Sequence, residues 1–188
     1  MGPQCEAQGM PSKSESSPWP TTISTPRLLL RPAETTDVKE FSRLWTDPEV
    51  RRFLGGPVAE EKLPLYQQHF ASRPNVFAVT TRKDMAVVGS VLIDSASRFD
   101  DRREVSYGLL PEHWGQGYAR EAVAAVVEWA FVNVPSDDAS IIAVTQEANT
   151  RSCRLLEAIG MRRIDRFVEF GAPQALFSVE RRRLRSGR

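Results

Sequence analysis

The feature that most constrains the fold lies between residues 104 and 131, where a strand-like pattern gives way to a helical one across two glycines. Residues 104–110 alternate apolar and polar side chains and stop at Pro111, which cannot donate to a β-ladder, so they predict a strand. After the glycines the apolar residues recur at the spacing of a helix that buries one face; they are Ala119, Ala122, Val123, Val126, Val127, Ala130 and Phe131. The sequence therefore predicts strand, tight loop and helix in immediate succession.

The loop between these two elements reads Trp114-Gly115-Gln116-Gly117-Tyr118-Ala119. Two glycines at the start of a helix let the backbone approach a ligand closely, and the N–H groups of the first helical turn have no partner within the helix. Together with the positive end of the helix dipole, this arrangement suits a diphosphate. The alternative is a loop that uses its glycines only for sharp turns. A dinucleotide-binding fingerprint is disfavoured, because its third small residue is replaced by Arg120.

Three motifs in fixed order resemble the GNAT acetyltransferase superfamily, and within it the RimJ/RimL-like branch. The first is the opening strand pattern Thr25-Pro-Arg-Leu-Leu-Leu-Arg31. The second is Gly115-x-Gly117-x-Ala119 after a strand that ends Gly-Leu-Leu-Pro, and the third is the segment from Asn149 to Met161. The resemblance spans residues 24–182.

The remaining pattern predicts further strands and helices on both sides of this unit. Strands are expected at residues 27–32, 76–81, 85–94, 140–145, 161–170 and 174–182, with Gly89 a possible bulge. Helices are expected from Val38 to the Asp47-Pro48 break, over residues 59–71 and over residues 149–159, the last ending at Gly160. We therefore predict an α+β fold with a central, mostly antiparallel mixed sheet flanked by helices, which is the fold that the resemblance implies.

Length and composition fit one domain. A chain of 188 residues with 41% hydrophobic residues can bury a single sizeable core. We place the domain at residues 25–184, after a disordered, proline-rich tail at residues 1–24 and before a basic tail at residues 185–188. The net charge of +1, the two distant cysteines and the absence of a long apolar run indicate a cytoplasmic protein without a membrane, nucleic-acid or metal partner.

The resemblance implies acetyl-CoA as the co-substrate. In the family, the strand before the glycine loop pairs with the pantetheine arm and the following helix N-terminus holds the diphosphate. Carried over, Leu109 and Leu110 would contact pantetheine, and the diphosphate would be held by Gln116, Gly117, Tyr118 and Ala119 next to Gly115. Trp114 occupies a position where Trp is usual in this branch, and simple anchoring of the loop is the favoured role for it.

Acetyl transfer to an amine needs a base, because an ammonium ion has no lone pair and free amines are almost wholly protonated at neutral pH. Glu104 is the candidate base, since several GNAT enzymes place a general base at this point of the strand. The alternative is a glutamate at a strand end that faces water.

The departing thiolate must also gain a proton. The superfamily often uses a tyrosine seven residues after the asparagine that opens the helix, but Leu156 stands there and cannot donate. The RimJ/RimL-like branch carries a serine three residues after the asparagine, and Ser152 fits. A water held by Asn149 competes with Ser152 for this role, and Asn149 is also expected near the pantetheine or as a plain N-cap.

The sequence leaves the acceptor open between a protein N-terminus and a small-molecule amine, and it leaves the assembly open between monomer and homodimer. Two other function classes are the alternatives. A non-catalytic acetyl-CoA-binding regulatory protein would keep the glycine loop and lose the base. An RNA-binding role for the arginine-rich segment after Glu180 is disfavoured, because no aromatic residues are interleaved for base stacking.

Overall fold

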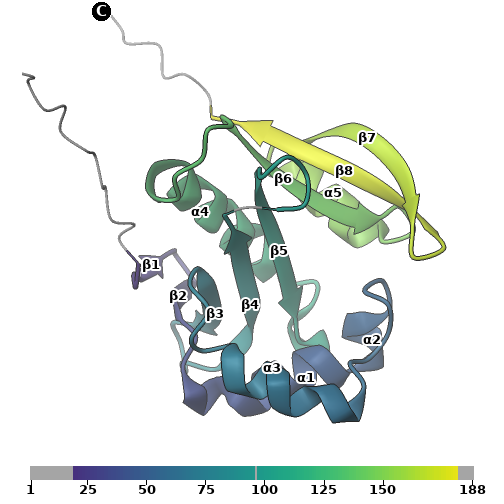
Figure 1. Cartoon of the computed structure of the whole chain (residues 1–188). Helices are drawn as coiled ribbons and strands as arrows, with labels where there is room; N and C mark the ends of the chain where they lie inside the picture. The colour runs from purple at the N-terminus through teal and green to yellow at the C-terminus, as the bar shows by residue number, and fades with distance from the viewer. Residues whose placement is uncertain (1–18, 96, 182–188) are drawn as a thin grey trace, which may run out of the picture.

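The computed structural model describes residues 19–95 and 97–181 (Figure 1). Its strands are β1 (Ile23–Ser24), β2 (Leu28–Pro32), β3 (Val76–Thr81), β4 (Val87–Asp94), β5 (Arg103–Leu109), β6 (Ser140–Gln146), β7 (Arg162–Glu169) and β8 (Ala172–Glu180). Its α-helices are α1 (Val38–Thr46), α2 (Pro48–Arg51), α3 (Leu63–His69), α4 (Tyr118–Asn133) and α5 (Thr150–Ala158). Short 3-10 turns are η1 (Thr35–Asp37), η2 (Glu60–Lys62) and η3 (Pro111–His113).

The eight strands form one sheet in the order β1-β2-β3-β4-β5-β6-β8-β7. Every neighbouring pair is antiparallel except β5 and β6, which are parallel. That parallel pairing joins only Arg103 to Ile141 and Glu104 to Ile142, and no later residue of the described β5 pairs with β6. Figure 1 shows β6, β8 and β7 turned away from β4 and β5. The predicted α+β fold, with a mostly antiparallel mixed sheet, is confirmed.

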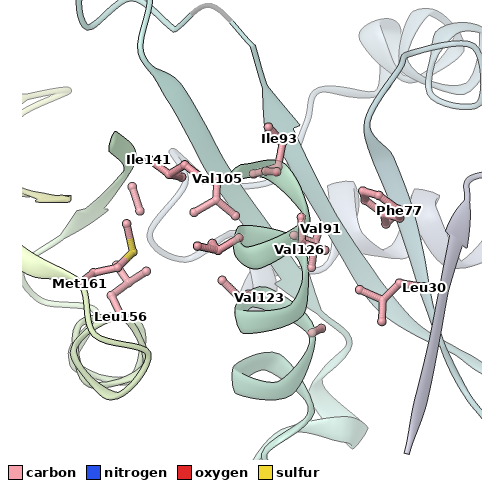
Figure 2. Packing of buried hydrophobic residues seen from close by; sticks show 14 of the residues in the cluster. Leu30, Phe77, Val91, Ile93, Val105, Val123, Val126, Ile141, Leu156 and Met161 are labelled. Atoms are coloured by element: carbon pink, nitrogen blue, oxygen red, sulfur yellow. The ribbon is translucent and has the colours of Figure 1, made fainter. Parts of the chain in front are cut away.

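The main core lies between the sheet and the helix predicted after the glycine loop. Figure 2 shows Val123 and Val126 of α4 with Phe77 and Leu30 of the first strands on one side and Leu156 of α5 on the other. All five of these side chains are fully buried. Each such side chain contributes about 1.5–3 kcal/mol by leaving water, so α4 binds both halves of the sheet to one core.

The opposite face of the sheet carries a smaller cluster beneath α1 and α3. Phe41 and Phe70 stack with ring centroids 4.7 Å apart over Val76 and Ala78 of β3. This layer covers the β3–β4 side and leaves Ser106 of β5 exposed. The two faces of β5 therefore differ: α4 covers one, and on the other Ser106 is exposed while Leu44 and Val50 lie over Gly108.

A buried arginine fixes the point where β5 and β6 separate. Arg103 is only 4% exposed, and its guanidinium donates to the carbonyl oxygens of residues 130, 134, 138 and 140 at 2.9–3.3 Å. Two of these carbonyls belong to the C-terminal end of α4, where the helix dipole favours a cation. Arg103 thereby joins the start of β5, the end of α4 and the start of β6.

The N-terminal prediction needs correction. Residues 1–18 lie outside the described residues, but residues 19–24 are not a disordered tail. Trp19 packs against Phe77 and Trp129, with ring centroids 5.0 and 6.4 Å away, and Ile23 pairs with Leu30 as part of β1. A lone tryptophan among prolines gives no periodic signal, so pattern reasoning missed it.

Other helix and strand ends differ by a few residues from those predicted from the sequence. The helix expected at residues 59–71 is a 3-10 turn followed by the shorter α3. Pro48 ends α1 as predicted, but it also begins α2, because Asp47 accepts bonds from the N–H groups of Glu49 and Val50. The last hairpin turns at Phe170 and Gly171, both with positive φ, so β8 begins earlier than expected. The segment expected at residues 185–188 lies outside the described residues.

Candidate active site

The glycine loop has the backbone shape that was predicted for it. Gly115 and Gly117 have φ of 76° and 78°, values that favour glycine, and Gly117 is the N-cap of α4. The first helical bond of α4 runs from Glu121 to the carbonyl of Gly117, so the three N–H groups before it have no partner in the helix. The loop thus presents free backbone donors at the positive end of a 16-residue helix.

Thr25 and Arg27, which lie between β1 and β2, hold this loop in place. Arg27 donates to the carbonyl of Gln116 at 2.8 Å and to the Glu121 carboxylate at 2.7 Å, and its guanidinium lies 4.8 Å from the centroid of the Tyr118 ring. The Thr25 hydroxyl donates to the same carboxylate at 2.6 Å. Bonds to the ionised Glu121 hold its pKa below the ordinary value, although its burial acts in the opposite direction. The Thr25-x-Arg27 motif therefore ties β1 and β2 to the glycine loop.

Trp114 anchors the start of the glycine loop, which is the role that the sequence favoured for it. Its indole N–H donates to the carbonyl of Leu109 at 2.7 Å, and Arg151 of α5 lies 5.2 Å from its ring centroid. The indole therefore holds the loop to the end of β5, and the arginine connects it to the N-terminal turn of α5.

The inner edge of β5 faces the gap toward β6. Leu110 donates its N–H to Val88 on the β4 side, and in an antiparallel pair alternate residues point their backbone groups to alternate edges. Tyr107 and Leu109 therefore direct their N–H groups toward the gap, where β6 has diverged. An extended chain with amide groups, such as pantetheine, fits this edge. The amide of Leu110 is already used inside the sheet, so of the two predicted leucines Leu109 offers the free donor.

Glu104 lies at the point where the gap opens. It pairs in register with Asp94 of β4 and is half-buried. Burial raises the pKa of the Glu104 carboxyl, and the nearby Asp94 and Glu169 raise it further, while Arg98 acts in the opposite direction. A carboxylate with a raised pKa is a better proton acceptor than a solvated one, so this environment suits a general base.

Glu169 is a neighbour of Glu104 that the sequence did not reveal. It is the last residue of β7, and its carboxylate accepts hydrogen bonds from both terminal nitrogens of Arg98. Arg98 lies in the β4–β5 connection, 71 residues away in sequence. No local sequence pattern signals such a pair, because the contact depends on where the β7–β8 hairpin lies in the sheet.

Ser152 and Asn149 occupy the first turn of α5. The Asn149 side chain accepts from the N–H of Ser152 at 3.2 Å, which makes Asn149 the N-cap. The Ser152 hydroxyl oxygen lies 2.6 Å from the hydroxyl oxygen of Tyr107 on β5. Burial raises the pKa of Tyr107 to about 12. Sequence reasoning placed Tyr107 only as an apolar strand position, because the 45-residue separation hides the contact.

Leu156, which stands where the superfamily often has a tyrosine, is fully buried in the main core. Of the two histidines, His69 lies exposed on α3 with its ring bonded to the carbonyl of Leu65. His113 lies in η3 and lines a pocket of about 310 Å³ together with Gln116 and Tyr118 of the glycine loop. Within residues 19–95 and 97–181 no cluster of three His, Cys, Asp or Glu side chains is placed to hold a metal ion. No helix in those ranges has the length and hydropathy needed to cross a bilayer.

Comparison with known proteins agrees with this arrangement. The acetyltransferase (GNAT) domain family matches residues 27–162. The sequence is 26% identical over 149 residues to a protein described as uncharacterized N-acetyltransferase p20 of Bacillus licheniformis, a match that covers 76% of this chain and 83% of that protein.

Solved structures share the fold. An acetyltransferase of the GNAT family from Bacillus anthracis superposes with a TM-score of 0.75 at 24% identity, covering 85% of this chain and 98% of that one. Spermidine N-acetyltransferase from Vibrio cholerae, solved with CoA and spermine, superposes with a TM-score of 0.70 at 18% identity, covering 83% and 96%. At these identities the solved structures support the fold alone, and the match to the family model shows the family.

Proposed function

The chain belongs to the GNAT acetyltransferase family and is an acyltransferase; from that premise we propose that it moves the acetyl group of acetyl-CoA to a primary amine by direct attack. The observation that supports this most is the separation of β5 from β6 beside the glycine loop. It leaves a free strand edge for the pantetheine arm and free N–H groups for the diphosphate, two requirements of one ligand.

The residues that would hold acetyl-CoA follow from this geometry. Leu109 offers its N–H at the strand edge, and Leu110 continues the strand into η3. The diphosphate would lie over Gly115, Gln116 and Gly117 and the first N–H groups of α4, at Tyr118 and Ala119. Trp114 fixes the loop, and Asn149 caps the helix on the far side of the gap. No metal ion is part of the proposal.

The proposed reaction joins the amine nitrogen to the acetyl carbon as the carbon–sulfur bond breaks. Two protons leave the ammonium nitrogen, one ending on the CoA sulfur and one in solvent. Glu104 is the proposed base, acting directly or through a water, because its raised pKa brings it closer to that of an amine. Ser152 is the proposed donor: its hydroxyl proton passes to the departing sulfur and is replaced by one of the two protons released from nitrogen. A water held by Asn149 is the competing donor.

Two finer assignments are also proposals. The Thr25-Pro-Arg27 motif supports membership of the RimJ/RimL-like branch, because its side chains brace the glycine loop.

The acceptor class is a small cationic amine or a protein N-terminus. Glu104, half-buried where the gap opens, is the carboxylate proposed to attract a cation; the neighbouring Asp94 and Glu169 are paired with Arg73 and Arg98. Glu147 of the β6–α5 connection is likewise paired, with Arg163 and Arg166.

The test is release of CoA thiol from acetyl-CoA with a panel of small amines, polyamines and peptides bearing free N-termini. Glu104→Gln should lower kcat ~100-fold or more, which is within the range for loss of a general base. Higher pH should partly restore the rate, because more acceptor is then neutral. Glu128→Gln, an exposed carboxylate on α4, is the matched control and should keep the wild-type rate. A wild-type rate in Glu104→Gln with an unchanged pH profile would remove Glu104 from the mechanism.

The rival reading is a regulatory protein that binds acetyl-CoA without turnover. It predicts a rise in Tm with acetyl-CoA and no thiol release with any amine. The position of Glu104, half-buried where β5 and β6 separate and with its pKa raised by burial, supports the enzyme over this alternative, because perturbed carboxylates cluster at catalytic sites.

A further inference from the structure

The contact between Tyr107 and Ser152 leaves one hydroxyl hydrogen without a partner. Their oxygens lie 2.6 Å apart, and in the described part of the chain neither hydroxyl makes a second hydrogen bond. One hydrogen bond uses one of the two hydrogens. The other must point to a ligand or to solvent.

The chemistry of the two groups decides which hydrogen is shared. A phenol is the stronger donor and an aliphatic hydroxyl the better acceptor, so Tyr107 donates and the Ser152 oxygen accepts. The buried phenol has its pKa raised to about 12, so it stays protonated and remains a donor throughout the neutral range. The hydrogen that remains free is therefore that of Ser152.

The position of the pair indicates which group the free Ser152 hydrogen faces. Tyr107 is on the edge of β5 that faces the gap, and Ser152 is on the first turn of α5, which follows β6 across the gap. This end of the nine-residue α5 has the positive end of the helix dipole, which favours an anion. On the proposed function, the sulfur of acetyl-CoA lies in this gap and becomes anionic as it departs.

We propose that Tyr107 is a positioning residue for acetyl transfer: its hydroxyl donates to Ser152 and so directs the Ser152 hydrogen at the departing CoA sulfur. As the carbon–sulfur bond breaks, its electron pair passes to sulfur, and the Ser152 hydrogen bond stabilises that charge. Tyr107 gives up no proton. Its phenol would have to ionise against its own burial to act as an acid, whereas orienting Ser152 needs no ionisation.

The first test measures binding and needs no acceptor. At a pH above the ordinary pKa of a thiol, about 8.5, free CoA binds partly as the thiolate, while acetyl-CoA carries no charge on sulfur. Tyr107→Phe and Ser152→Ala should each weaken CoA binding ~10-fold, the size expected for one charge-assisted hydrogen bond. Acetyl-CoA affinity should change less than ~2-fold. Isothermal titration with each ligand measures the difference.

The control is Tyr66→Phe, which removes a tyrosine hydroxyl that makes no hydrogen bond to the described chain and lies on α3. It should leave both affinities unchanged. Equal weakening of CoA and acetyl-CoA by Tyr107→Phe would show a packing role, and no weakening of either would show no role. Both results overturn the inference.

The second test is a double-mutant cycle on kcat with the best amine of the panel. Tyr107→Phe should lower kcat and leave the KM for acetyl-CoA unchanged, and the double variant with Ser152→Ala should be no slower than Ser152→Ala alone. Additive losses would overturn an action through Ser152. Wild-type protein that binds both ligands without turning over any amine would instead remove the proposed function, and the binding comparison would still decide the role of Tyr107.

Discussion

Glu104 is a residue whose charge the fold makes costly. Burial and two nearby carboxylates raise its pKa, so the native state binds a proton more tightly there than the unfolded chain does, whose glutamate titrates near 4.5. Stability therefore falls as pH rises from 4.5 through the raised pKa, and the full cost remains at every higher pH. The same environment that prepares Glu104 to accept a proton destabilises the protein at neutral pH.

Glu104→Gln should consequently raise Tm at pH 7 while it lowers turnover, because the amide keeps the shape and carries no buried charge. Each kcal/mol regained corresponds to about 2–4 °C for a domain of this size. Scanning calorimetry from pH 4 to pH 8 checks this, and the gain over wild type should vanish below pH 4.5. A gain that persists in acid would show better packing, and a loss of Tm at pH 7 would show that Glu104 stabilises the fold through its attraction to Arg98.

At the scale of elements, the glycine loop and α4 act as one unit. A side chain at Gly117 would start at a positive φ, and its Cβ would lie 3.3 Å from the Arg27 guanidinium. Gly117→Glu should abolish acetyl-CoA binding, since bulk and negative charge would fill the position proposed for the diphosphate. The measurement is the Tm shift that saturating acetyl-CoA produces.

Gly160→Glu is the matched control for the loop. Gly160 also has positive φ, at 91°, and nothing lies within 4 Å of a Cβ built on it, but it follows α5 and lies outside the loop. It should lose similar stability through backbone strain and keep the acetyl-CoA shift. Loss of the shift in both variants would mean that strain, and not the loop, is responsible.

How far these elements can be predicted depends on the range of the interactions that form them. The strand, loop and helix around the two glycines follow from local periodicity, and the structure confirms all three. The same holds for the Asn149 cap and for Gly160 beyond α5. In contrast, the helix expected over residues 59–71 is the shorter α3 preceded by a 3-10 turn, and none of the seven residues of α3 is buried.

The parts of the candidate site that could be predicted are those set by local sequence: the positive φ of the two glycines, the Trp114 anchor and the Asn149 cap. The contacts of Tyr107 with Ser152, Arg98 with Glu169 and Thr25 with Glu121 join residues 45, 71 and 96 positions apart. A single sequence contains no signal for such pairs, because they depend on sheet order and on which strands diverge.

At the scale of the whole molecule, Arg103 connects the two parts of the sheet. Arg103→Met should cost at least ~2 kcal/mol, because it removes the Arg103 donor from the buried or partly buried carbonyl groups of residues 134, 138 and 140; the carbonyl of residue 130 keeps the N–H of Val134. Arg103→Lys should recover only part of this loss, since one ammonium cannot reach four separated oxygens. Urea denaturation measures both, with the exposed Arg154→Met as control. Equal stability of all three would show that water satisfies these carbonyls.

The N-terminal segment belongs to the fold from Trp19 onward. Trp19→Ala should destabilise the protein by ~1–3 kcal/mol, because it removes two aromatic pairs worth ~0.5–1.5 kcal/mol each. Deleting residues 1–22 should lower Tm at least as much, which reverses the expectation drawn from the sequence. Thermal unfolding of both variants checks this, and a deletion with wild-type Tm would show that Trp19 packs without stabilising.

The parting of β5 from β6 means that this sheet has four borders rather than two. The outer borders are β1 and β7, and the inner borders are the facing sides of β5 and β6 beyond Glu104. A strand border with free N–H and C=O groups recruits another extended chain. On the proposed function this recruit would be acetyl-CoA, whose pantetheine arm would enter as a ninth strand that is not peptide. Each turnover would then close and reopen the sheet, and the sheet would be continuous only while the co-substrate is bound.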